Sequence, residues 1–221
     1  CSSDLQALPD APVISSEGRA FPVERRYQPL PSHQRFDEAI AIATAELLRQ
    51  EAGSLLLFLP GVGEIQRVQE QLSTRVGGDV LLCPLYGALS LQDQRKAILP
   101  APAGQRKVVL ATNIAETSLT IEGIRLVVDS AQERVASFDP RTGLTKLLTQ
   151  RISQASMVQR AGRAGRLEPG ICLHLTSAEQ AERAAQQSTP EILQSDLSGL
   201  VMDLLQWGCP NPEQLTWLNP P

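Results

Sequence analysis

Short apolar runs alternate with helix-like stretches along most of the chain, and this alternation restricts the possible folds more than any other feature. The apolar runs cover residues 54–59, 80–84, 107–111, 124–128 and 170–175, and residues 21–27 alternate apolar and polar side chains like an entering strand. Between them, residues 33–50, 63–72, 91–99 and 178–187 are typical of helices. This order predicts an α/β fold, with a parallel sheet covered by helices on both faces.

One segment, residues 134–152, breaks the alternation. Two strand-like runs there flank Asp139, Pro140, Arg141, Thr142 and Gly143. Proline presets one turn position and glycine supplies a positive φ, so the segment predicts an inserted β-hairpin.

The two ends of the chain differ from its middle. Residues 1–20 are rich in Ser, Pro and Asp and are interpreted as a connector from an earlier domain. After Pro190, apolar residues recur at helical spacing up to Gly208, which would either complete the core or begin another domain. Because the chain starts at Cys1 and stops at Pro221, we expect it to be a piece of a longer protein.

Composition narrows the function classes. The 221 residues carry a net charge of −4, which argues against wholesale electrostatic capture of nucleic acid. A local contact is still available, because residues 141–166 contain several arginines and a lysine and no acidic residue. The cysteines are scattered and form no C-x-x-C pair, so no metal site or disulfide frame is expected. The absence of a signal peptide and of a membrane span favours a cytoplasmic protein with no membrane partner.

The densest charge pattern is an arginine run at residues 159–166. Arg160, Arg163 and Arg166 recur every third position among alanines and glycines, with Gln159 four residues before Arg163. On a helix these side chains would lie on neighbouring faces. Guanidinium groups pair with phosphate oxygens in two-pronged fashion, which suits phosphoryl transfer. The alternative is a solvated basic helix face.

A hydroxyl-rich segment at residues 111–123 follows one of the apolar runs. Thr112, Thr117, Ser118 and Thr120 can bind backbone phosphates or ribose hydroxyls without reading bases. The alternative is a turn of serine and threonine that caps a helix.

Together these two segments resemble motifs V and VI of the DEAH-box RNA helicases. Residues 57–61 resemble motif IV and residues 84–89 the segment after it, and the order agrees over residues 21–207. The bacterial HrpB branch of the family is the most similar. The resemblance implies a second RecA-like domain over residues 21–188, the beginning of a winged-helix or helical region at 189–221, and ATP-dependent helicase and hydrolase activity in the parent protein.

The resemblance also assigns roles to individual residues. Gln159 would act at the γ-phosphate or the attacking water, and Arg163 and Arg166 would be arginine fingers. The nucleotide would contact Ser118, Thr120, Glu122 and Ile98. The RNA backbone would contact Gly61, Gly87, Thr112, Asn113 and Thr117. The hairpin turn, Asp139 to Gly143, would lie near the nucleic acid and separate strands, although an ordinary surface hairpin is the alternative.

Two positions depart from the family pattern. Relatives more often carry Asp where Glu122 stands, which makes its ribose contact less secure. Many carry an aromatic residue where Ile98 stands, and an isoleucine grips a base through apolar contact alone. We therefore expect weak discrimination among ATP, GTP, CTP and UTP.

The sequence contains neither G-x-x-x-x-G-K-[ST] nor D-E-A-H, so the chain is expected to be half of a split site. ATP, or another NTP, and Mg²⁺ would be held mainly by a preceding RecA-like domain, and the isolated chain would not hydrolyse NTP. RNA is the expected partner, with single-stranded DNA as a second candidate and a 3′ to 5′ direction implied by the family. The alternatives are a non-catalytic RNA-binding module that uses residues 141–166 and a protein-interaction module that uses the apolar stripe at 192–205.

Overall fold

The computed structural model describes residues 10–12, 14 and 20–221. Most of the expected connector, residues 1–20, lies outside these residues. The chain divides into two compact units. The sheet unit comprises Arg19–Arg134 and Thr149–Ser188, and the second unit contains Val135–Leu148 and Thr189–Pro221.

The elements follow the predicted alternation closely. The strands are β1 (Val23–Tyr27), β2 (Ser54–Phe58), β3 (Val80–Leu85), β4 (Arg106–Ala111), β5 (Ile124–Asp129), β6 (Gln132–Asp139), β7 (Leu144–Arg151) and β8 (Gly170–His174). The helices are α2 (Phe36–Gln50), α3 (Val62–Ser73), α4 (Leu91–Ile98), α5 (Ile114–Thr117), α6 (Gln154–Gly162), α7 (Ala178–Glu182) and α8 (Ser198–Gln206), with 3₁₀ turns η1 (Glu191–Leu193) and η2 (Pro212–Gln214).

Six strands form one sheet in the order β1-β8-β5-β2-β4-β3, and every neighbouring pair in it is parallel. β2 lies between β4 and β5 and is buried along its whole length. A parallel sheet is covered on both faces, which explains why its central strands are continuous apolar runs without polar alternation. The predicted α/β class is therefore confirmed.

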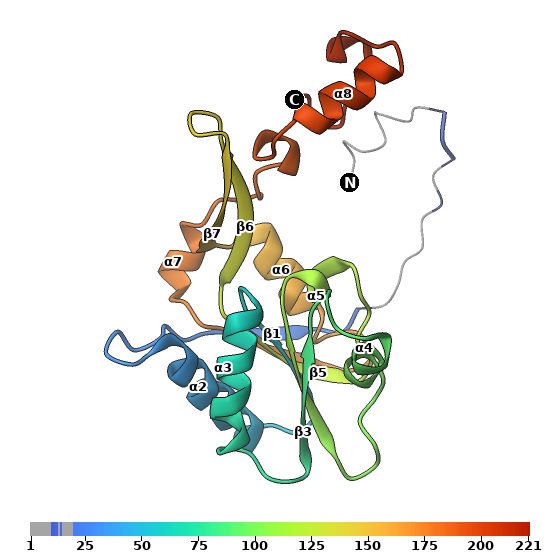
Figure 1. The fold of residues 1–221 in the computed structure, drawn as a ribbon. Coiled ribbons are helices and arrows are strands. Elements are labelled where there is room, and N and C mark those ends of the chain that lie inside the picture. The colour runs from blue at the N-terminus through green and yellow to red at the C-terminus, as the bar shows by residue number, and fades with distance from the viewer. Residues whose placement is uncertain (1–9, 13, 15–19) are drawn as a thin grey trace. The chain divides into compact units, whose positions relative to one another are not determined.

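Successive side chains of a strand point to opposite faces of the sheet, and the core is divided accordingly. Leu55 and Leu57 of β2 pack in a cluster with α2 and α3, whereas Leu56 and Phe58 pack in a second cluster with α4, α5 and α6. Figure 1 shows α2 and α3 on one side of the sheet and α4 on the other. Each fully buried leucine stabilises the fold by about 1.5–3 kcal/mol.

The inserted hairpin is formed by β6 and β7, which make a separate two-stranded sheet. Its turn has the predicted mechanism: Gly143 has a φ of 66°, and its N–H donates to the carbonyl of Asp139 at 2.9 Å. The Asp139 side chain accepts the backbone N–H of Arg141 at 3.0 Å, which stiffens the turn further. β7 is exposed along its whole length.

The helix predicted over residues 178–187 is too long, because α7 ends at Glu182. The residues after it turn back toward the start of α6. The backbone N–H of Gln154 donates to the carbonyl of Ala185 at 2.8 Å, and that of Ala155 to Gln186 at 3.0 Å. These carbonyls satisfy free N–H groups at the start of α6. Nε2 of Gln154 also donates to the carbonyl of Glu182 at 2.9 Å, which a longer α7 would have paired with the N–H of Gln186.

The apolar stripe after Pro190 was predicted as one helix and forms two pieces, η1 and α8. Asp196 separates them, because its carboxylate accepts both the backbone N–H and the hydroxyl of Ser198, at 2.9 and 2.7 Å. Aspartate competes with helix continuation in this way. On α8, Leu204 is buried, while Val201, Met202 and Leu205 are exposed.

Candidate functional site

The residues assigned to the RNA backbone lie where parallel strands end. Gly61 follows β2, Gly87 follows β3, and Thr112 and Asn113 follow β4 directly. Since β2, β4 and β3 are neighbours and parallel, these residues share the carboxyl edge of the sheet. This edge is where open α/β sheets bind their ligands.

The surroundings of these residues differ. A side chain at Gly87 would meet nothing within 4 Å, and Asn113 and Thr117 are exposed. Gly61 is buried at the start of α3, and a Cβ there would lie 2.1 Å from Nη1 of Arg134. The hydroxyl-rich segment contains the short helix α5, and Asn113 stands at its N-cap without a capping side-chain hydrogen bond.

The arginine run is not one continuous helix. α6 ends at Gly162, Arg163 is its C-cap, and Arg166 lies beyond it. After the helix, the chain pairs with the segment just before β1: the N–H of Phe21 donates to the carbonyl of Gly165 at 2.8 Å. The neighbouring-face geometry expected for all three arginines therefore does not apply past Arg163.

Arg160 is fully buried, which removes it from any basic surface. Its Nη1 donates to the carboxylate of Asp129 at 2.8 Å, and its Nε to that of Glu116 at 3.1 Å. Its guanidinium also lies 4.8 Å from the ring centroid of Phe58. A buried guanidinium requires such partners, so Arg160 has a structural role.

The network continues from Asp129 across the sheet. Asp129 and His174 stand opposite each other at the ends of β5 and β8, and Nδ1 of His174 lies 2.7 Å from the second carboxylate oxygen. Nε2 of His174 accepts from Nε of Arg25 at 3.0 Å, so Nδ1 carries the proton that is donated to Asp129. Burial raises the pKa of Asp129, but the Arg160 charge and the His174 hydrogen bond outweigh burial and hold it below its ordinary value.

Arg163 and Arg166 differ from Arg160, because neither forms an ion pair with a carboxylate of the described residues. Nε of Arg163 donates to the backbone carbonyl of Glu116 at 2.7 Å, and its Nη1 to that of Leu119 at 3.3 Å. Nη1 of exposed Arg166 donates to the hydroxyl of Thr120 at 3.2 Å. Burial and then the Arg166 charge lower the pKa of Arg163, while Glu116 opposes them.

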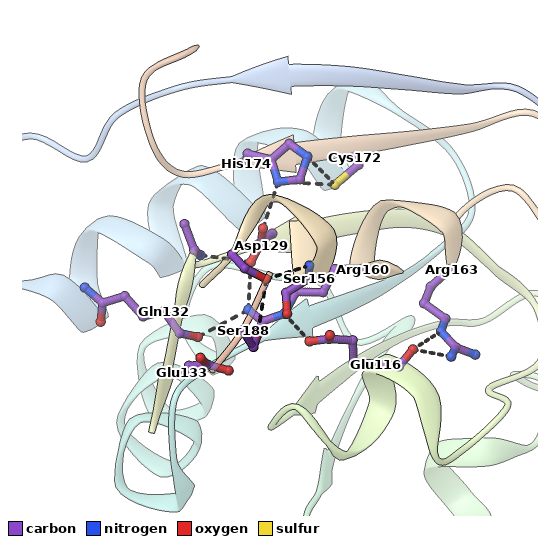
Figure 2. Close-up of polar contacts among 12 residues, drawn as sticks. Glu116, Asp129, Gln132, Glu133, Ser156, Arg160, Arg163, Cys172, His174 and Ser188 are labelled. Carbon is purple, nitrogen blue, oxygen red and sulfur yellow. Dashed lines mark hydrogen bonds and ion pairs between the residues drawn. The ribbon is translucent and has the colours of Figure 1, made fainter. Parts of the chain in front are cut away.

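Glu116 connects the structural arginine to the exposed part of the run. Its carboxylate accepts from Arg160, while its backbone carbonyl accepts from Nε and Nη2 of Arg163 (Figure 2). The sequence pattern indicated no role for Glu116, Asp129 or His174. The acidic residue Glu116 in the hydroxyl-rich segment was a signal for an ion pair with the arginine run. Its charge alone did not indicate which arginine it pairs with.

The other nucleotide candidates lie near the C-terminal end of α4. The backbone N–H of Glu122 donates to the carbonyl of Ile98 at 3.0 Å, which brings these two residues together. Lys107, also missed by the sequence analysis, closes the end of α4 by donating from Nζ to the carbonyls of Ala97 at 2.8 Å and Ile98 at 3.3 Å. Burial lowers the pKa of Lys107 to about 8. Ser118 is exposed nearby in sequence, after α5.

Gln159 is exposed on α6, one helical turn before Arg163. The structure thus separates the candidates into two groups. Beside α4 and α6, Arg166 is hydrogen-bonded to Thr120 and Glu122 to Ile98, while Arg163 donates to the carbonyls of Glu116 and Leu119 in the same hydroxyl-rich segment. The glycines and Thr112 lie at the carboxyl edge of the sheet.

Within the described residues, no group of three or more His, Cys, Asp or Glu side chains is arranged to hold a metal ion. In the same part of the chain, every helix is too short or too polar to cross a membrane.

Residues 38–168, more than half of the chain, match the model of the family described as Helicase conserved C-terminal domain. The chain belongs to this helicase C-terminal domain family. It is also 82% identical over 216 residues to the ATP-dependent RNA helicase HrpB of Escherichia coli (strain K12), covering 98% of this chain and 27% of that protein. It is 38% identical over 225 residues to the probable ATP-dependent RNA helicase DHX34 of Homo sapiens, covering 96% of this chain and 20% of that protein.

Solved structures agree with the assignment to the helicase C-terminal domain family. The fold matches a crystal structure of the Escherichia coli DEAH/RHA helicase HrpB with a TM-score of 0.96 at 80% identity, covering 100% of this chain and 28% of that chain. A second crystal structure, of the E. coli DExH-box NTPase HrpB, matches with a TM-score of 0.93. The RecA-like fold and the resemblance to DEAH-box helicases are thereby confirmed. This helicase C-terminal domain spans 20–28% of the length of these relatives.

Proposed function

We propose that the chain is the second motor domain of an ATP-dependent RNA helicase and that Arg163 and Arg166 are its arginine fingers. One observation carries the proposal: the arginine run divides into a buried Arg160 with two carboxylate partners and two further arginines with none among the described residues. The charge of Arg160 is therefore compensated within the fold, whereas the charges of Arg163 and Arg166 are available to a ligand.

The chemistry of these side chains fits a nucleotide phosphate. Burial and then the Arg166 charge lower the pKa of Arg163, and a phosphate beside both guanidinium groups would relieve the repulsion between them. When bound, ATP supplies the phosphoryl group that is transferred and Mg²⁺ neutralises part of its charge. Gln159 is exposed on α6 one turn before Arg163, where it would orient a water molecule, and Ser118, Thr120 and Glu122 would offer oxygens to a ribose.

The proposal requires a second domain. The sequence lacks the phosphate-binding lysine motif and the acidic metal-binding motif of an NTPase, so ATP and Mg²⁺ would be held mainly by a preceding RecA-like domain. We therefore assign residues 21–188 to the second RecA-like domain, residues 1–20 to the connector and residues 189–221 to the beginning of a winged-helix region. The isolated chain is expected to be inactive.

The carboxyl edge of the sheet is the proposed RNA site. Gly61, Gly87, Thr112, Asn113 and Thr117 offer backbone groups, hydroxyls and an amide, which suit sugar-phosphate contacts and carry no base specificity. Single-stranded DNA remains a second candidate, since only the 2′-hydroxyl separates the two ligands. The hairpin turn at Asp139, Pro140, Arg141, Thr142 and Gly143 is the proposed strand separator.

Ile98 is the proposed base contact, and it predicts low nucleotide selectivity. It is half-buried at the end of α4 and offers only apolar atoms from its side chain. Apolar contacts discriminate weakly between bases, because only an unpaired polar group rejects the wrong ligand strongly. A cytoplasmic location stays a prediction.

The alternative of a non-catalytic RNA-binding surface over residues 141–166 is weakened, because Arg160 is buried and offers no charge to a ligand. The protein-interaction alternative rests on the exposed apolar side chains of α8, and it predicts a complex that nucleotide does not affect.

The test is RNA-stimulated ATP hydrolysis by a longer protein that contains this chain. Arg163→Ala should lower the rate by about 10³–10⁵-fold, and Arg166→Lys nearly as much because an ammonium cannot form the two-pronged contact. Arg183→Ala is the matched control, since Arg183 is an exposed arginine paired with Glu179 on α7. Equal hydrolysis by wild type and Arg163→Ala, or hydrolysis by the isolated chain, would refute the proposal.

A further inference from the structure

The hairpin joins the sheet unit at two residues. Arg134 of β6 is the last residue of the sheet unit before Val135, and Thr149 of β7 is the first residue of that unit after Leu148. Both Nε and Nη2 of Arg134 donate to the hydroxyl of Thr149, each at 3.3 Å. The adjacent residues pair as well, because Nε2 of Gln150 donates to the carboxylate of Glu133 at 3.0 Å. Two consecutive cross-strand pairs therefore hold the root of the hairpin.

The root is also tied to α3. Nη2 and Nη1 of Arg134 donate to the two carboxylate oxygens of Glu64, at 2.7 and 3.2 Å, which is a two-pronged ion pair. The side chain of Glu64 is only 12% exposed and that of Arg134 30%. Burial raises the pKa of Glu64, but the hydrogen bonds from Arg134 and the Arg134 and Arg67 charges outweigh burial and leave it below its ordinary value. Such shielded two-pronged pairs are stronger and more directional than exposed ones.

Gly61 completes the arrangement. Its φ of −165° is accessible to any residue, so its backbone does not require glycine. Lack of space restricts this position to glycine, since a Cβ would lie 2.1 Å from Nη1 of Arg134 and 2.9 Å from Oε2 of Glu64. An added methyl group would displace the guanidinium from the ion pair. The proposed RNA-contacting glycine and the root of the proposed strand separator are thus in direct contact through Arg134.

We propose that Arg134 and Glu64 are positioning residues that couple the carboxyl-edge RNA site to the hairpin, so that they are required for strand separation but not for NTP hydrolysis. The inference rests on the proposed function of the hairpin. Neither residue touches the candidate nucleotide site beside α4 and α6. Loss of Glu64 would leave the root held by the Thr149 and Gln150 contacts, and loss of Arg134 would leave only the Gln150 contact. In either case the hairpin would be held less firmly and would separate fewer base pairs for each NTP hydrolysed.

The experiment uses a longer helicase that contains this chain and measures base pairs unwound per ATP hydrolysed. Arg134→Gln and Glu64→Gln should each lower this ratio by about tenfold while RNA-stimulated hydrolysis is retained. The double variant should be no worse than either single variant, because the two residues act as one unit. Arg134→Lys should also fail, since lysine keeps the charge but not the two-pronged contact.

Arg67→Gln is the matched control. Arg67 contacts the same Glu64 carboxylate at 3.3 Å but is 51% exposed and does not reach the hairpin root. It should leave the ratio unchanged. Hydrogen exchange on the 221-residue chain gives a second readout that needs no activity. The amides of Arg134 and Thr149 should exchange faster in Glu64→Gln than in wild type or Arg67→Gln.

The outcomes distinguish the strand-separator role of the hairpin from the coupling role of the Arg134–Glu64 ion pair. If shortening the Asp139–Gly143 turn leaves unwinding intact, the strand-separator role is wrong. If shortening the turn abolishes unwinding while Arg134→Gln and Glu64→Gln keep the wild-type ratio, the coupling role of the ion pair is wrong and the strand-separator role stands. Unchanged exchange at the root in Glu64→Gln would also overturn the coupling role. Additive losses in the double variant would show that the two residues act separately.

Discussion

Replacing Arg160 with methionine should destabilise the chain by about 3–5 kcal/mol, the usual cost of removing one partner from a buried ion pair. The structure accounts for a value in this range. Arg160 and Asp129 are both fully buried, and the substitution leaves the Asp129 carboxylate with His174 and a backbone N–H as its remaining partners. Methionine retains much of the apolar stem, so lost packing adds little.

Urea denaturation of the chain, followed by circular dichroism at pH 7, measures this loss. Arg160→Met combined with Asp129→Asn should recover part of the stability, because the double variant leaves no unpaired buried charge at Asp129. A loss below about 1 kcal/mol, or additive losses in the double variant, would refute the structural role of Arg160.

The loss should also depend on pH. The pKa of Asp129 is lowered in the folded wild type, so its contribution to stability is present above its unfolded pKa of about 3.9 and is lost as pH falls through the folded value. In Arg160→Met the Asp129 pKa rises, and protonation relieves the unpaired charge at a higher pH. The difference between variant and wild type should therefore shrink from pH 7 toward pH 4. An unchanged difference would contradict the assignment.

Three further predictions concern packing and protonation. Burial lowers the pKa of Lys107 from 10.5 to about 8, so the unfolded chain binds more protons than the folded chain between these pH values. The free energy of unfolding should therefore rise from pH 8 to 10.5, by at most about 3 kcal/mol. Lys107→Met should remove this rise. Gly165→Ala places a Cβ 2.5 Å from the carbonyl oxygen of Phe21 and should cost roughly 1–3 kcal/mol in a thermal melt, whereas Gly162→Ala meets open space and should not destabilise the fold. Burial raises the pKa of Cys172 well above its ordinary value, so iodoacetamide should modify it, as followed by mass spectrometry, only after denaturation.

The strands were predictable because their signal is local. A parallel sheet covered on both faces needs continuous apolar runs, and β2, β4 and β5 are such runs. The turn at Asp139 was predictable for the same reason, since proline and glycine act within a few residues. The end of α7 was not, because the carbonyl of Glu182 accepts from the side chain of Gln154, which is 28 residues away.

The roles of the arginines depend on partners far away in the sequence. Arg160 is structural because of Asp129, 31 residues away, and Glu116, 44 residues away, and spacing within the run gives no sign of either. The pair of Arg134 and Glu64 spans 70 residues. The residue pattern indicated the run and the hydroxyl-rich segment as candidate sites, but the partners of each residue within them are set by the tertiary structure.

The most direct test of the account compares two variants of a longer helicase that contains this chain, one from each group of candidates. Arg163→Ala should lower RNA-stimulated ATP hydrolysis by about 10³-fold or more while its affinity for single-stranded RNA without nucleotide stays at the wild-type value. Asn113→Ala, at the carboxyl edge, should weaken RNA affinity while hydrolysis at saturating RNA is retained. If each variant loses both RNA affinity and hydrolysis, or if Arg163→Ala loses RNA affinity alone, the separation of nucleotide and RNA functions between the two groups is wrong.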